Sequence, residues 1–99
     1  MNIIVTIPQG VLNQVRAVGQ LKNPQAINYR EGLTVLDVVI ASGGLAEFAA
    51  GNRSKIVRTV NGKRTELKVR IKDIAEKGDL RTNVALLPGD VLFVPESRF

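Results

Sequence analysis

Residues 33–44 read Leu-Thr-Val-Leu-Asp-Val-Val-Ile-Ala-Ser-Gly-Gly, and they predict the main helix of the chain. The Thr34 hydroxyl can cap the free backbone amides of the first turn, while Asp37, three positions later, supplies the reciprocal acid. Gly43 and Gly44 follow the helix, and the first of them is a natural left-handed cap. Residues 35–41 leave almost no polar face, so we expect the helix to be covered nearly all round, as when a sheet wraps it.

Apolar runs before the helix predict strands. Residues 3–7 form one run, which is closed by the turn Pro8-Gln9-Gly10, and residues 11–18 form the next. The segment from Gly19 to Pro24 is rich in turn residues, so we expect a bend there. A short extended segment over residues 26–29 should follow it.

The strongest local signal after the helix is Asn61-Gly62, which lies between two runs of alternating residues, 56–60 and 63–71. Asn-Gly tolerates the two positive φ angles of a type I′ turn, so a β-hairpin is predicted. Ile56 should then oppose Leu67, and Arg58 should oppose Thr65. This register puts Arg58 on the core side of the hairpin, where it must reach past the edge of the core or find a partner.

Alternation along the second arm of the hairpin separates an apolar face from a charged one. The apolar face holds Leu67, Val69 and Ile71, and the charged face holds Glu66, Lys68, Arg70 and Lys72. We therefore expect three cations of this arm to point to water.

Shorter signals complete the order of elements. The connection over residues 45–54 has room for a short turn of helix, and residues 73–77 fit a single helical turn stopped by Gly78. Pro88-Gly89-Asp90 predicts a turn that aims the last strand, with Asp90 satisfying backbone amides. That strand, residues 91–94, is continuously apolar, so we expect it to be buried on both faces. The order predicts an α+β fold of the β-grasp type, a mixed sheet around one main helix plus a short helical turn.

Ninety-nine residues, of which 44% are apolar and 23% charged, are expected to form a single domain over 1–99. Cys and His are both absent, which removes disulfides, thiol nucleophiles, imidazole bases and the metal sites built on those ligands. We expect no metal and no cofactor. The serines have no imidazole to activate them, so we expect no enzymatic activity either.

The formal net charge of +5 has one source in the chain. Residues 1–52 carry equal numbers of cations and anions, whereas residues 53–77 hold nine cations against three anions. Such a face can attract phosphates, anionic lipids or acidic sugars, or it can be a solvated strand face that keeps the domain soluble. The candidate residues for contact with acidic groups of a ligand or of a neighbouring subunit are Arg53, Lys55, Arg58, Arg64, Lys68 and Arg70.

Several motifs in this order and spacing resemble a known family. They are Val18-Gly19, Asn23-Pro24, residues 33–37, residues 41–45, Val57-Arg58 and residues 87–95. Together they look like the soluble ligand-binding β-grasp (SLBB) domain of bacterial polysaccharide export proteins. Residues 29–32, 47–53 and 95–99 look closer still to the export protein of exosortase-linked exopolysaccharide systems.

The resemblance implies a fragment of a longer export protein at the periplasmic face of the bacterial outer membrane. It implies partners that are other copies of the parent protein, arranged in a ring around a channel for sugar polymer. Contacts with the polysaccharide itself are left open, and contact with the membrane is expected only through the parent protein.

Two other functions are weighed against this one. A nucleic-acid-binding domain would use the basic segment, but the sequence lacks interleaved aromatic residues and a recognition helix, so we expect no nucleic acid partner. A ubiquitin-like modifier or sulfur carrier of the same fold needs a free Gly-Gly carboxyl end. Here the Gly-Gly pair is internal, at residues 43 and 44.

Overall fold

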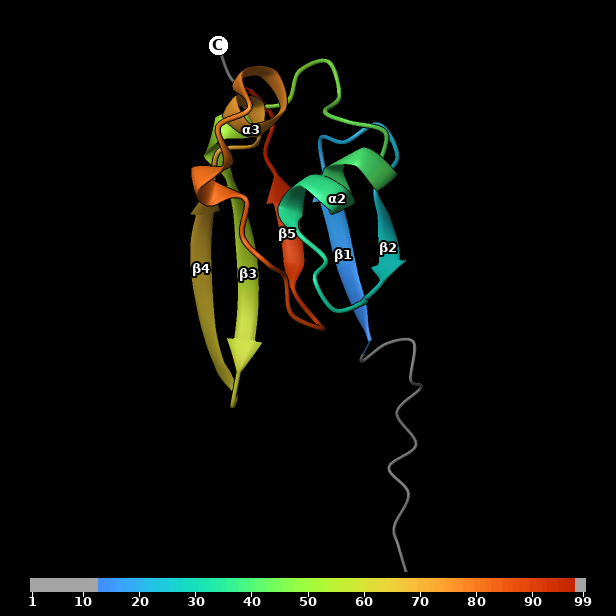
Figure 1. Ribbon diagram of the computed structural model, residues 1–99, viewed down its shortest axis with the longest axis vertical. Coiled ribbons are helices and arrows are strands. Elements are labelled where there is room, and N and C mark those ends of the chain that lie inside the picture. Colours follow the sequence, from blue (N-terminus) through green and yellow to red (C-terminus); the bar gives the residue numbers. More distant parts are fainter. Residues whose placement is uncertain (1–12, 98–99) are drawn as a thin grey trace, which may run out of the picture.

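The structure is a computed structural model that describes residues 13–97 of the chain. Its centre is a five-stranded sheet in the order β2-β1-β5-β3-β4, with α2 packed over one face and α3 at one end of the strands (Figure 1). The strands are β1 (Gln14–Gly19), β2 (Gln25–Asn28), β3 (Ser54–Val60), β4 (Lys63–Val69) and β5 (Val91–Val94). The helices are α2 (Val35–Ala41) and α3 (Ile71–Lys77), with short 3-10 turns η1 (Gly51–Arg53) and η2 (Leu80–Thr82).

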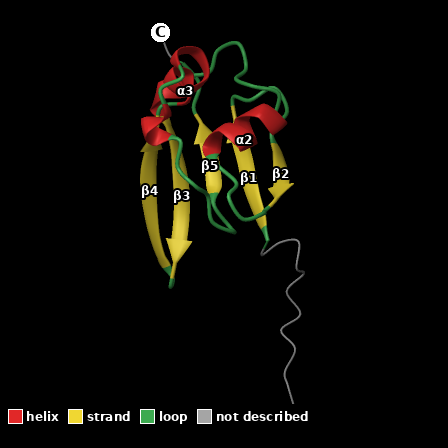
Figure 2. Cartoon of the chain, viewed as in Figure 1, coloured by secondary structure: helices red, strands yellow, loops and turns green. Residues whose placement is uncertain are grey.

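The sheet is mixed, because β1 and β5 are parallel while the other neighbouring strands are antiparallel. This arrangement confirms the predicted α+β fold with one main helix and a short helical turn (Figure 2). The predicted strand over residues 3–7, its closing turn and residues 11–12 lie outside the described residues. The extended segment expected at 26–29 is β2, one residue earlier.

The helix α2 begins and ends as its sequence predicts. Thr34 and Asp37 form the reciprocal capping box, with the Asp37 backbone N–H donating to Thr34 Oγ1 over 3.3 Å and the Thr34 N–H to Asp37 Oδ2 over 3.0 Å. At the other end, the Gly44 and Gly43 N–H groups donate to the carbonyls of Val39 and Ile40, and both glycines have positive φ. This paired bonding satisfies carbonyls that the helix itself leaves free.

The prediction that α2 is covered nearly all round is wrong. Val35, Val38 and Val39 are buried against the sheet, but Ile40 is 67% exposed. In a helix of only two turns the sheet contacts one face, and nothing among the described residues covers the other. The expectation that β5 is buried on both faces is also wrong. Leu92 and Val94 are buried, but Phe93, on the opposite face of the sheet, is 36% exposed.

The hairpin prediction is confirmed in its turn and its register. Asn61 and Gly62 have φ angles of 53° and 77°, as a type I′ turn requires. Ile56 pairs with Leu67 and Arg58 with Thr65.

The second arm of the hairpin is shorter than predicted. It ends at Val69, and Ile71 is the first residue of α3 instead of a strand residue. The backbone turns at Arg70, whose N–H donates to Thr82 Oγ1 over 3.0 Å, a partner that β3 cannot supply there. Lys68, Arg70 and Lys72 therefore do not form the single row of cations that alternation predicts.

Gly19 is required at the junction of β1 with the bend that leads through Pro24 to β2. Its φ is +97°, and a Cβ at this position would collide with the Val94 carbonyl of the neighbouring strand. The next residue uses that same carbonyl, since the Gln20 N–H donates to Val94 O over 2.8 Å.

Within the described residues, neither helix is long and apolar enough to cross a membrane.

Candidate functional site

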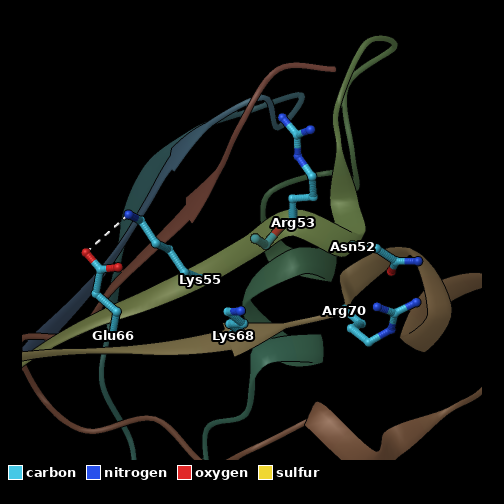
Figure 3. Close-up of a pocket in the computed structure, with 7 residues that line it drawn as sticks. Asn52, Arg53, Lys55, Glu66, Lys68 and Arg70 are labelled. Carbon is cyan, nitrogen blue, oxygen red and sulfur yellow. Dashed lines mark hydrogen bonds and ion pairs between the residues drawn. The ribbon is translucent and has the colours of Figure 1, made fainter. Parts of the chain in front are cut away.

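The pocket that collects most of the candidate cations lies where β3 begins and β4 ends, beside η1 and the start of α3 (Figure 3). Its volume is about 530 Å³, and every residue that lines it is polar or charged. The lining residues are Asn52, Arg53, Ser54, Lys55, Glu66, Lys68 and Arg70. Four cations therefore face one carboxylate, and this excess of positive charge favours an anionic ligand.

One side of the pocket is built by the pairing of β3 with β4. Lys55 and Lys68 lie directly opposite one another, an arrangement that like charges make unfavourable. Glu66 relieves it, because its Oε2 lies 3.2 Å from Lys55 Nζ, and the two side chains point toward each other in Figure 3. Lys55 Nζ also lies 5.9 Å from the centroid of the Phe93 ring. Lys55 is thus occupied by groups of the protein, whereas Lys68 makes no ion pair with any described residue.

The other side is held by Asp73, which lies on α3 just behind the pocket. Asn52 donates through Nδ2 to Asp73 Oδ1 over 3.1 Å and accepts the Asp73 backbone N–H over 3.0 Å. Arg70 Nε donates to Asp73 Oδ2 over 3.0 Å. The hydrogen bond from Asn52, followed by that from Arg70, lowers the pKa of Asp73 below its usual range. An Asp73 that stays ionised fixes both Asn52 and Arg70 at the rim.

The turn η1 is attached to the sheet and to α3 by close packing. The Ser54 hydroxyl donates to the Gly51 carbonyl over 2.8 Å. A Cβ at Gly51 would lie 2.7 Å from Leu45 Cδ1 and 3.0 Å from the Lys72 backbone nitrogen. A side chain here would displace Leu45 and crowd the Lys72 backbone, so η1 packs closely against α3. Arg53, the last residue of η1, lines the pocket.

The structure brings together four of the six candidate cations, namely Arg53, Lys55, Lys68 and Arg70. Arg64 lies near the hairpin turn, at the other end of β4 from the pocket. Arg58 lies on the helix-covered side of the sheet and pairs with Asp90, with 2.8 Å between Nη2 and Oδ2 and 3.0 Å between Nε and Oδ1. Hydrogen bonding to Asp90 raises the pKa of Arg58. The Arg58 guanidinium therefore pairs with a carboxylate of the fold and does not contribute to the pocket.

Sequence reasoning missed Asn52, Glu66 and Asp73 as parts of this site. Asn52 and Asp73 are separated by 21 positions, and no local pattern indicates that the two side chains would meet. Glu66 was visible as a single anion among the cations of the second arm. Its pairing with Lys55 follows from the correctly predicted register, which places position 66 diagonally across from position 55.

The internal Gly-Gly pair is fixed at the end of α2, where both N–H groups bond to helix carbonyls. Across residues 13–97, no three Asp or Glu side chains come close enough together to hold a metal ion.

The family model described as "SLBB domain" matches residues 13–94. The match includes the whole sheet, both helices and every residue of the pocket.

Proposed function

Because the chain belongs to the SLBB domain family, we propose that it is a non-catalytic binding module of a bacterial polysaccharide export protein, of the exosortase-linked exopolysaccharide type. In this proposal the domain lies at the periplasmic face of the outer membrane, where the β3–β4 hairpin contacts neighbouring copies of the parent protein. Residues 29–32 and 47–53 support the finer assignment by their resemblance to that type of export protein.

The exposed edge of the sheet at β4 is the observation that carries the subunit contact. β4 is the last strand of the sheet, and six of its seven residues are exposed. An edge strand presents unpaired backbone N–H and C=O groups that can pair with another chain. Among residues 13–97 no segment covers this edge.

The charge of the same edge favours one kind of contact between copies. Lys63, Arg64 and Lys68 lie along β4 with a single anion, Glu66. Two such edges carry charge of the same sign, which disfavours pairing of this edge with itself and favours its contact with a different surface of the neighbour. Contacts of that head-to-tail kind generate closed rings when the rotation closes. A ring of copies can enclose a channel for polymer.

Charge reversal near the hairpin turn tests this function. A bacterium whose polymer export depends on the parent protein would carry Lys63→Glu together with Arg64→Glu, two positions outside the pocket. We expect a large loss of secreted polysaccharide and a smaller assembly after detergent extraction. The matched control is Lys22→Glu with Arg30→Glu, which makes the same change of charge at exposed residues elsewhere. Normal export and normal assembly size in the hairpin variant would contradict the proposal.

A further inference from the structure

We propose that the pocket between β3, β4 and η1 binds the carboxylate of an acidic sugar residue, a hexuronate, in the exported polymer. The inference rests on the proposed function for the presence of an exported polysaccharide. It adds the chemical class of the ligand and the residues that bind it, with Arg53, Lys68 and Arg70 as the cations that face it.

The charges in the pocket leave donors free for such a ligand. Lys55 is held by Glu66, whereas Arg53 and Lys68 form no ion pair with any residue in the described part of the chain. Arg70 donates to Asp73 through Nε, and its two terminal nitrogens bond to none of residues 13–97, so they remain available. Two parallel N–H groups of an arginine match the two oxygens of a carboxylate, and charge-assisted bonds of this kind are about twice as strong as neutral ones.

The donors are held in place before the ligand arrives. Asp73 fixes the direction of the Arg70 side chain, and the two hydrogen bonds between Asn52 and Asp73 join η1 to α3. The Ser54 hydroxyl closes the same turn on Gly51. A site that is already ordered loses less conformational entropy on binding, which leaves more of the interaction energy as affinity.

Two features favour an acidic sugar over a small inorganic anion. The pocket volume of about 530 Å³ is in the range that proteins use for small organic ligands. Glu66 places a carboxylate in the lining, with one oxygen occupied by Lys55, and a carboxylate can accept hydrogen bonds from sugar hydroxyls. A polyhydroxylated monoanion meets both conditions.

Calorimetric and NMR titrations of the full chain with tetragalacturonate, and with the neutral tetragalactose as comparison, test the inference. We expect the acidic oligosaccharide to bind at least about tenfold more tightly, the ratio that one additional charge-assisted interaction supplies. Arg53→Gln together with Lys68→Gln should reduce that affinity by about tenfold or more. The matched control, Lys22→Gln with Arg30→Gln, should leave it unchanged.

Three results would overturn the inference. They are equal affinity for the acidic and neutral oligosaccharides, unchanged affinity in the pocket variant, or tighter binding of a single-stranded DNA oligomer of equal charge at the same residues. The hairpin variant Lys63→Glu with Arg64→Glu separates this test from that of the proposed function, because it should lose assembly and keep tetragalacturonate binding. A protein that assembles but shows no preference for the acidic sugar refutes the pocket assignment alone.

Discussion

Asp90 lies almost completely inside the fold, with 1% of its surface exposed, in the turn that precedes β5. Its Oδ2 accepts the Leu87 backbone N–H over 2.8 Å, and both carboxylate oxygens accept N–H groups of Arg58. The sequence predicted that Asp90 would satisfy backbone amides and that Arg58 would either reach past the edge of the core or find a partner. That they partner each other was not predictable, because 32 positions separate them and only the pairing of β3 with β5 brings them together.

Removal of the guanidinium should destabilise the domain through Asp90. In Arg58→Met the buried carboxylate loses its counter-ion, and we expect a cost of about 3 kcal/mol in the free energy of unfolding, at the low end for buried pairs. The low end applies because 20% of the Arg58 side chain is exposed to water. Urea denaturation of both proteins measures the difference.

The double variant Arg58→Met with Asp90→Asn provides the control for this interpretation. It should be more stable than the sum of the two single changes predicts, because no unpaired charge is left in the interior. Additive costs would show that the two residues act separately and would contradict the account of their pairing.

At the scale of single elements, α2 shows how far local sequence determines structure. The capping box and the Gly-Gly ending are local signals, and both were predicted because their partners lie within a few residues. Burial of the helix depends on the other elements, and the apolar sequence around Ile40 carried no sign that this side would remain open. The hairpin was predicted for the same reason as the caps. The predicted start of α3, residue 73, is two residues later than the observed start, because the strand before it ends at a contact with Thr82, which is distant in sequence.

Two substitutions in α2 test its one-sided burial. Val38→Ala should lower the free energy of unfolding by about 1–2 kcal/mol, because it leaves a cavity at a fully buried position. Ile40→Gln should change it by less than about 0.5 kcal/mol, since surface changes of this kind are usually neutral. Thermal and urea unfolding give both values. A larger cost for Ile40→Gln than for Val38→Ala would contradict the observed packing.

Acid should weaken the attachment of α3 to η1, which Asp73 makes, and the N-terminal cap of η2, which Asp79 makes. Hydrogen bonds from Arg81 lower the pKa of Asp79 to about 2, and hydrogen bonds from Asn52 and then Arg70 lower the pKa of Asp73. In the unfolded chain both carboxyls titrate near pH 4. Their contribution to stability is therefore complete above about pH 4 and is lost as the pH falls toward the folded pKa values.

The variant Asp73→Asn with Asp79→Asn makes this pH dependence measurable. At pH 7 we expect it to be less stable than the parent chain, and the difference should shrink as the pH falls from about 4 to 2. Urea unfolding at a series of pH values gives the comparison. A difference that stays constant over this range would show that the two carboxylates are not specifically stabilised in the fold.

At the scale of the whole molecule, the sheet separates two environments. α2 and the core lie on one face of the sheet, whereas Lys55, Glu66 and Lys68 of the pocket lie on the opposite face, next to the exposed edge strand β4. The basic segment over residues 53–77 was identified from the sequence, because the charge of a segment follows from its residue types alone. Which of its cations converge was not, since that depends on η1 packing against α3 and on the end of β4 at Val69.

Hydrogen–deuterium exchange of the assembled parent protein, compared with the same protein at a concentration where the copies separate, tests the contact through the hairpin most directly. The proposal predicts slower exchange over residues 63–69 in the assembly, because a neighbour covers the backbone groups of the sheet edge. Unchanged exchange in β4, with slowing confined to α2 and residues 80–87, would contradict it.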